Sequence, residues 1–300
     1  MAFPSKEIIF KTLYDSRHKT NEFQDLFTPT NNDAEYWYYS DLYNLFRSPM
    51  FDIEHMHDDV YRKFDATPAK NISPYEFLKQ HTTFTSHKYT IFSPHPPFNP
   101  INKNGKDIRL SRYACFCMFR DTPQLIFTRT FFMMPNADFQ TIYNTSYRFA
   151  RIYQRERLRS SERQLAGLLK RLNANIALFH HETHKTFFGG TESDYIRTVY
   201  QISHNRALAD NMGAISMHAR RHAIDNAITK FRFAPTQDFR SFALIFNNEL
   251  LAARRKMFTD YKIKPEQDFY KTPINAVESE YKKAVRDFTK QYAPVNINSR

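Results

Sequence analysis

The sequence offers three places where side chains could support catalysis or hold a metal ion, and the first is His180-His181-Glu182-Thr183-His184. On a helix, the first and last histidines of this segment share one face, as two zinc ligands would. The segment contains H-E-x-H, one residue short of the H-E-x-x-H pattern of zinc proteases. A third ligand would have to come from Asp194 or His204 through the fold. We therefore expect histidines at the surface or at a helix cap, and no bound metal ion.

The second place is the cluster of His55, His57, Asp58 and Asp59, whose carboxylates could hold Mg²⁺ in a nuclease. The cluster falls on a predicted helix without the strand-borne acids and lysine of nucleases, so a solvated helix face explains it better. The third place is Cys115, which lies in an apolar run with no histidine nearby. We therefore predict a protein without catalytic residues and without a cofactor.

The chemistry that the composition favours is binding of a polyanion. The chain of 300 residues carries 43 Lys and Arg against 31 Asp and Glu, for a net charge of +12. Residues 1–150 hold 17 basic and 16 acidic residues, whereas residues 151–300 hold 26 and 15. An excess of this size favours nucleic acid or a membrane surface as the partner. A basic protein that is merely soluble is the alternative.

The densest basic segment, residues 148–171, fits a helix over residues 147–173. Its apolar positions recur at steps of three and four, as a core-facing stripe requires: Ile152, Leu158, Leu165, Leu168, Leu169 and Leu172. Arginine pairs with phosphate through a planar fork. Four candidate DNA-binding residues lie along one edge of this helix: Arg148, Arg151, Arg155 and Arg159. A fifth candidate, Arg163, follows at the next step of four residues. A solvated helix face is the alternative explanation.

A second basic patch lies in the first half of the chain. Its candidate DNA-binding residues are Lys103, Lys106, Arg109 and Arg112. Ser111 can cap a helix over residues 111–119, which places Arg112 in the first turn, where free N–H groups favour an anion. The alternative is that Tyr113 and Cys115 belong to the core and that Arg112 braces a carboxylate.

The elements that position these residues indicate a mostly helical α+β protein. Helices are predicted over residues 3–17, from Ser40 to before Pro49, and over residues 53–64, 73–82, 111–119, 147–173 and 276–292. Strands are predicted over residues 36–39 and 89–92 and on both sides of the turn at Asn104-Gly105. Residues 259–267 are predicted as a linker. A small sheet among helices is typical of winged helix–turn–helix domains.

Several classes of protein are excluded by composition. With only 5 glycines, the chain has no G-x-G-x-x-G segment and no P-loop. Residues 125–135 form the most apolar run, which Arg129 interrupts, and charges near the start argue against a signal peptide. Cys115 and Cys117 cannot supply a disulfide framework or a four-ligand zinc site. We expect a soluble, cytoplasmic protein that does not contact a membrane.

Three segments carry a family pattern. The most specific is Asp107-Ile108-Arg109-Leu110-Ser111-Arg112-Tyr113-Ala114-Cys115, close to D-I-x-L-S-R-Y-A-C. The others are Tyr36-Trp37-Tyr38-Tyr39-Ser40-Asp41-Leu42 with Leu45, and Phe188-Gly189-Gly190 followed by Asp210 and Met212-Gly213. Over residues 35–232 the chain thus resembles the bacterial DNA-damage-inducible protein D family, whose N-terminal part is similar to the Bro-N domain of viral and phage DNA-binding proteins.

The chain departs from this family in three places. Phe46-Arg47 replaces a Gly-Tyr pair, the acidic residue after Met-Gly is missing from residues 214–218, and the region from Asp238 onward has no counterpart. The resemblance and the charge together predict four regions. These are an N-terminal extension (1–34), a Bro-N-like, winged-helix DNA-binding domain (35–134), a basic helical domain (135–258) and a C-terminal helical extension (259–300).

The predicted function is non-catalytic DNA binding in a DNA-damage (SOS) response or a phage-related setting, and DNA is the predicted partner. The alternative is an interaction protein that targets a recombination or repair protein and contacts DNA weakly. A metal-dependent nuclease is the third hypothesis. The sequence leaves the oligomeric state open, with a homodimer among the alternatives.

Overall fold

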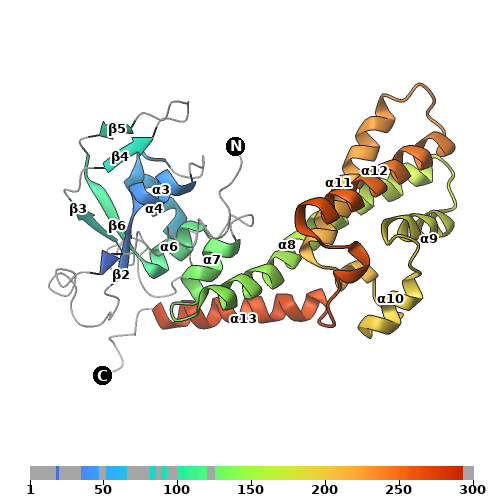
Figure 1. Cartoon of the computed structure of the whole chain (residues 1–300). Coiled ribbons are helices and arrows are strands. Elements are labelled where there is room, and N and C mark those ends of the chain that lie inside the picture. Colours follow the sequence, from blue (N-terminus) through green and yellow to red (C-terminus); the bar gives the residue numbers. More distant parts are fainter. Residues whose placement is uncertain are drawn as a thin grey trace. The chain divides into compact units, whose positions relative to one another are not determined.

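The computed structural model describes residues 18–19, 35–46, 52–65, 82–85, 89–92, 100–103, 105–119 and 126–292 (Figure 1). The chain divides into two compact units. Unit 1 comprises residues 1–143 and 283–300, and unit 2 comprises residues 144–282. The predicted helices over residues 3–17 and 73–82 lie outside the described residues, apart from Thr82, which begins a strand.

Unit 1 contains a four-stranded sheet in the order β1-β2-β6-β3 and a two-stranded sheet of β4 and β5, both antiparallel. The strands are β1 (His18–Lys19), β2 (Glu35–Tyr38), β3 (Thr82–Thr85), β4 (Tyr89–Phe92), β5 (Pro100–Lys103) and β6 (Asp107–Ser111). Trp37 of β2 lies opposite Leu110 of β6. The strands flanking Asn104-Gly105 do not pair with each other, because β5 pairs with β4 and β6 pairs with β2 and β3.

The helices of unit 1 bury aromatic side chains against this sheet. They are α3 (Tyr39–Phe46), α4 (Met56–Asp65), α6 (Arg112–Phe119) and α7 (Ile126–Met133). Every residue of α6 is buried, so α6 is the central helix of the unit. The ring of Trp37 meets that of Phe132 edge-on at 5.1 Å, and Phe119 stacks on Phe132 at 5.8 Å.

Two serines near the helix starts act differently from each other. The Ser111 hydroxyl accepts a hydrogen bond from the Ala114 N–H at 3.2 Å, which confirms the predicted cap of α6. Ser40 lies inside α3, which begins at Tyr39, and its hydroxyl donates to the buried carboxylate of Asp107. The predicted helix thus begins one residue earlier, at Tyr39, and the Ser40 hydroxyl binds a carboxylate on β6 instead of the N-terminus of α3.

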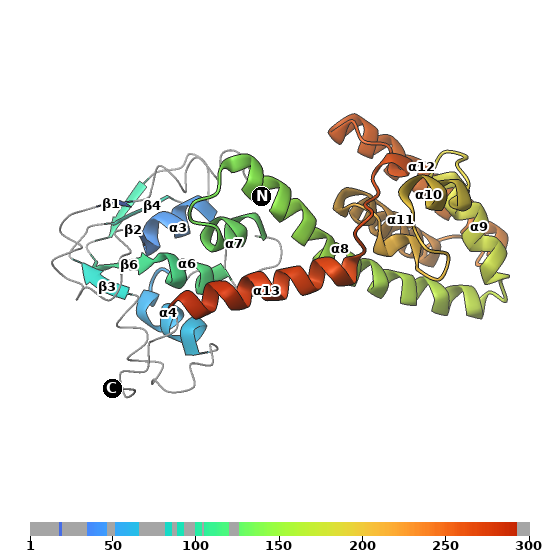
Figure 2. The same cartoon turned by 90° about the horizontal axis from the view of Figure 1, so that it is seen from below.

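The described regular structure of unit 2 is helical, apart from an isolated β-bridge between Met212 and Phe269. Its helices are α8 (Phe139–Arg171), α9 (Ile176–Phe187), α10 (Ser193–Tyr200), α11 (Ala214–Arg232), α12 (Phe239–Tyr261) and α13 (Ile274–Tyr292). Of α8 only the part from residue 144 belongs to unit 2, and of α13 only the part up to residue 282. Two 3₁₀ turns connect the helices, η2 (Leu208–Asp210) and η3 (Pro265–Gln267). Figure 2 shows α9 to α12 gathered around the second half of α8. A stack of Phe179, Phe242 and Phe246 fills the core, with ring centroids 5.3–6.0 Å apart.

The predicted apolar stripe of α8 is confirmed, since Leu158, Leu165, Leu168 and Leu169 are buried. The helix begins earlier than predicted because the Asp138 carboxylate accepts the Thr141 N–H at 2.8 Å. The predicted C-terminal extension is not a separate region. Val277 is fully buried in unit 2, while Phe288 stacks on Tyr113 at 5.9 Å in unit 1.

These elements confirm a mostly helical α+β class. The observed division after residues 143 and 282 differs from the predicted boundaries after residues 134 and 258, because α8 and α13 each contribute to both units. In the part of the chain that the structure describes, no helix combines the length and apolar character needed to cross a membrane.

Candidate nucleic-acid interface

Arg151, a predicted phosphate contact, lies inside unit 2 with none of its surface exposed. Its Nε donates to the carbonyl of Met212 at 3.0 Å, and its Nη2 donates to the carbonyls of Asp210 and Thr272 at 3.1 and 3.0 Å. Its guanidinium also lies over the Tyr270 ring at 4.5 Å, and burial lowers the pKa of the group. Arg151 therefore cross-links three segments of the fold, and its assignment to the DNA-binding surface is corrected.

The assignment of Arg155 to the DNA-binding surface is corrected for the same reason. Arg155 is 6% exposed, and its Nε and Nη1 donate to Asp210 at 2.7 Å and to Glu162 at 2.9 Å. Arg159 is exposed but reaches the same Asp210 carboxylate at 3.4 Å, and Arg148 pairs with Glu280. The edge of α8 that we predicted to face DNA instead turns its arginines toward acceptors of unit 2.

In unit 1, Arg112 is also buried rather than available to a duplex. It is 1% exposed, its Nη1 donates to the carbonyl of Phe131 at 3.0 Å, and its guanidinium lies over the Trp37 ring at 5.2 Å. The Phe131 acceptor is a backbone carbonyl. Arg109 is half-buried, over the Tyr36 ring at 4.7 Å.

Two lysines also belong to the predicted basic patch of unit 1. Lys106 is exposed beside β6, and Lys103 ends β5, with its side chain outside the described part of the structure. Of the members of the predicted patch whose side chains the structure describes, Lys106 is thus the one that is exposed. Arg109 and Arg112 therefore offer less accessible charge than the sequence suggested.

The exposed side of α8 retains five cations. We call this the α8 basic face, and it consists of Arg157, Arg159, Arg163, Lys170 and Arg171, with Glu156 as its exposed acid. Arg163, Lys170 and Arg171 make no side-chain hydrogen bond or ion pair with any residue that the structure describes. Of the predicted candidates on α8, Arg163 is therefore the one that is exposed and unpaired among the described residues, while Lys170 and Arg171 were outside the predicted set.

A polar cavity of about 430 Å³ lies between α8 and α11. It is lined by Arg157, Ser160, Ser161 and Gln164 from α8 and by Arg221, Asp225, Ile228, Thr229 and Arg232 from α11. The Asp225 carboxylate accepts from the Ser161 hydroxyl at 2.5 Å and from Arg221 Nη1 at 2.9 Å. Sequence reasoning missed Arg221 and Arg232, although their spacing with Asp225 along one helix face was the available signal.

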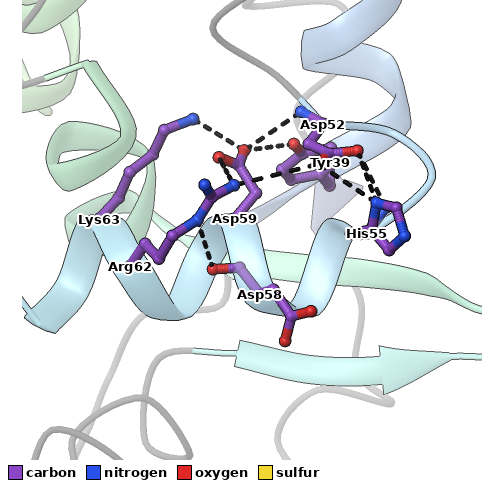
Figure 3. Close-up of polar contacts among 7 residues, drawn as sticks. All are labelled: Tyr39, Asp52, His55, Asp58, Asp59, Arg62 and Lys63. Atoms are coloured by element: carbon purple, nitrogen blue, oxygen red, sulfur yellow. Dashed lines mark hydrogen bonds and ion pairs between the residues drawn. The ribbon is translucent and has the colours of Figure 1, made fainter.

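The predicted nuclease-like carboxylates form a closed ion-pair cluster in unit 1 (Figure 3). Asp59 is 4% exposed and accepts hydrogen bonds from the Tyr39 hydroxyl and from Lys63 Nζ, the latter at 2.7 Å. Asp52 accepts from the His55 backbone N–H at 3.1 Å and contacts the His55 ring at 3.3 Å. Arg62 lies 3.6 Å from Asp59 and joins the two acids.

This cluster stabilises α4 and does not resemble a metal site. Burial and the Asp59 carboxylate raise the pKa of Tyr39, and burial lowers the pKa of Lys63 despite its ion pair. The prediction of a solvated face holds for exposed Asp58 and is wrong for Asp59. Among the described residues, no three His, Cys, Asp or Glu side chains lie close enough together to hold a metal ion.

The histidine segment and the cysteines are part of the packing. His180 and His184 lie on one face of α9 with ring centroids 6.2 Å apart, and His184 contacts the Phe188 ring at 5.9 Å. Burial, reinforced by Arg220, lowers the pKa of His184 to about 2, so this side chain is neutral in the folded protein. His184 is half-buried in the last turn of α9. Cys115 is fully buried as predicted, and burial raises the pKa of its thiol.

The glycines of the family pattern have structural roles in unit 2. Gly189 has φ +62°, and a Cβ there would lie 2.3 Å from the Arg254 guanidinium. A Cβ on Gly213 would lie 1.8 Å from the carboxylate of Asp268. That carboxylate accepts the Ser216 N–H at 3.0 Å and thereby caps the start of α11. Both glycines allow a charged side chain to approach the backbone closely.

The chain matches no family model, and no curated protein and no solved structure was found to be similar to it. A functional assignment therefore depends on the side chains described above and on the resemblance of the three segments.

Proposed function

We propose that this protein binds DNA without catalysis, as a regulator in a DNA-damage response or a phage-related setting, and that unit 2 contacts the phosphate backbone. The observation that carries this proposal is the α8 basic face. From Arg157 to Arg171 it spans about 21 Å at 1.5 Å per residue. Duplex DNA carries one charge per about 1.7 Å of its axis with both strands counted, so a duplex segment of this length carries on the order of a dozen phosphates, some of which lie on the side that α8 would contact.

Unit 1 receives its proposed role from the resemblance. The segments around Trp37 and Ser111 support assignment of unit 1 to the Bro-N-like, winged-helix class, in which a small sheet accompanies a DNA-binding helix. Because Arg112 is buried, unit 1 does not use that residue for DNA in this proposal. The regulatory setting rests on the same resemblance and on no contact in the structure.

One observation favours the alternative, an interaction protein that targets a recombination or repair protein. Helix α12 exposes Leu244, Leu251 and Phe258 at seven-residue steps, with Leu244 64% exposed. A seven-residue repeat of exposed apolar side chains is typical of a surface that packs on another helix. Arg240 and Arg255 flank this line, so an acidic amphipathic helix is the partner that it fits. A metal-dependent nuclease has the least support, because the Asp59 carboxylate is already paired.

The experiment is a salt series of DNA affinity, measured by fluorescence anisotropy with purified full-length protein on single- and double-stranded DNA. On duplex, log Kd should change with log salt by about 0.9 per neutralised phosphate, or about 5 for six contacts. A slope near zero would exclude DNA binding and favour the α12 alternative. Incubation with supercoiled plasmid and Mg²⁺ tests the nuclease hypothesis by nicking.

A charge-matched pair of variants locates the surface. The triple variant Arg163→Gln, Lys170→Gln and Arg171→Gln should reduce the slope by up to about three units and weaken all DNA sequences about equally. The control removes the same charge elsewhere, with Arg240→Gln, Lys264→Gln and Lys271→Gln, and should change affinity much less. Equal effects of the two triples would mean that net charge, rather than the α8 basic face, determines binding.

A further inference from the structure

The cavity between α8 and α11 has the polar lining of a ligand site within unit 2. On α8 the lining residues repeat at steps of three and four from Arg157 to Gln164, and on α11 they do so from Arg221 to Arg232. Each helix therefore presents one continuous face to the cavity. Three arginines and one carboxylate line it, so the excess charge favours an anionic ligand.

Arg221 is the fixed donor of this cavity. Its Nη1 is held by Asp225, which the Ser161 hydroxyl from α8 also binds. Its Nε is buried and has no hydrogen-bond partner in the described part of the chain. An ion pair already holds the guanidinium in place, so a ligand oxygen that contacts the exposed part of Arg221 would immobilise it at a smaller entropic cost than a cation in solvent. Asp225 thus orients the guanidinium and leaves donors for a ligand.

The remaining lining residues supply mobile charge and neutral polar groups. Arg157 and Arg232 are exposed, and Arg157 uses Nη1 for the Tyr153 hydroxyl at 2.9 Å. Ser160 and Gln164 form no side-chain hydrogen bond with any residue that the structure places. Burial lowers the pKa of nearby His218, and Arg221, His222 and Arg157 lower it further, as expected where positive charge gathers. Tetrahedral oxygens between arginine forks are the ligand that this set matches.

We propose that the α8–α11 cavity binds a phosphate group of the DNA backbone, with Arg221 as the fixed donor and with Arg157 and Arg232 closing on the phosphate from the two helices. This inference rests on the DNA-binding function proposed above and names one phosphate site within it. Arg157 joins the site to the α8 basic face, so a strand that follows α8 would place one phosphate at the cavity.

The first test uses exposed residues whose replacement leaves the core intact. The double variant Arg157→Gln and Arg232→Gln should weaken duplex binding about tenfold and lower the salt slope by about two units. The matched control, Arg240→Gln with Arg255→Gln on α12, removes the same charge and should change affinity less than about twofold. Equal losses in the two double variants would overturn the site while leaving DNA binding itself intact.

The second test distinguishes binding through the planar guanidinium of Arg221 from binding through its positive charge alone. Arg221→Lys keeps the charge but lacks the planar fork, so we expect duplex binding to weaken about threefold to tenfold with an unchanged circular dichroism spectrum. Wild-type affinity in Arg221→Lys would show that Arg221 is not the fixed donor. If Arg221→Lys does not fold, the affinity of the double variant Arg157→Gln and Arg232→Gln decides whether the cavity binds a phosphate.

The source of the phosphate is tested with pyrophosphate by isothermal titration calorimetry. A site for the DNA backbone should bind pyrophosphate weakly or not at all, and duplex binding should depend on Arg157 and Arg232. Tight pyrophosphate binding that Arg221→Lys abolishes, with duplex binding unchanged in every variant, would identify a small-molecule site and overturn the inference. A wild-type protein that does not bind duplex at all would overturn both this inference and the proposed function.

Discussion

At the scale of single residues, the Asp268 carboxylate lies so close to Gly213 that it leaves no room for a side chain at position 213. Any Cβ at Gly213 would overlap the carboxylate that caps α11. We expect Gly213→Ala to lower the free energy of unfolding by about 2 kcal/mol or more, because the carboxylate must move away from Ser216. Urea denaturation followed by circular dichroism measures the change.

Gly167 provides the matched control for this substitution. It lies inside α8, and a Cβ there would meet no atom within 4 Å. Gly167→Ala should raise stability by about 0.5–1 kcal/mol, since alanine loses less backbone entropy in a helix. Equal effects of the two substitutions would show that the approach of Asp268 does not limit position 213.

At the scale of an element, α8 combines an arginine that stabilises the fold with arginines that remain in solvent. Arg151 donates to the carbonyls of Asp210, Met212 and Thr272. We expect Arg151→Met to cost about 3 kcal/mol of stability, because it leaves buried carbonyls without donors. On the same helix, Arg163→Met should change stability by less than about 0.5 kcal/mol, since Arg163 is exposed and unpaired among the described residues. Thermal denaturation of both variants provides the comparison.

This difference matters for any study of DNA binding. A variant that replaces Arg151 or Arg155 would lose affinity through unfolding of unit 2 and would not identify a phosphate contact. If Arg151→Met were as stable as the wild type yet failed to bind DNA, Arg151 would be a direct contact and its buried position would not persist in the complex.

At the scale of the whole molecule, the two units should respond differently to acid. His184 of unit 2 has its pKa lowered from 6.5 to about 2, mainly by burial. The unfolded chain therefore binds a proton below pH 6.5 that the folded unit does not, so stability falls as the pH falls from about 6.5 toward 2. Between pH 7 and pH 5 we expect a loss of about 2 kcal/mol from this group.

Two probes can follow the two units. Trp37 is the single tryptophan of the chain and lies buried in unit 1, while the helices α8 to α12 of unit 2 contribute to far-UV circular dichroism. His184→Gln should reduce the acid-induced loss detected by circular dichroism and leave the Trp37 transition unchanged. The remaining loss comes in part from His180 and His218, whose pKa values burial also lowers. His204→Gln, at an exposed histidine, should remove none of it. An unchanged pH dependence in His184→Gln would contradict the lowered pKa of this half-buried histidine.

The sequence by itself determined those elements whose signals are local. The aromatic run at Trp37 predicted β2, Ser111 predicted the start of α6, and the leucine spacing predicted the buried stripe of α8. A cap acts within one turn, and an apolar face repeats every three or four residues, so a short window of sequence contains both signals. Cys115, which lies in an apolar run and belongs to a residue type that is commonly buried, is in the core.

Only the tertiary structure decided which charges are accessible. Arg151 reaches Thr272 from 121 residues away, and Asp59 reaches the Tyr39 hydroxyl from 20 residues away. The phosphate site proposed here likewise joins Ser161 to Asp225 across 64 residues. Periodicity defines the face of a helix on which an arginine lies, but it does not determine what covers that face. Whether an arginine is buried or meets solvent depends on acceptors that distant segments bring to it.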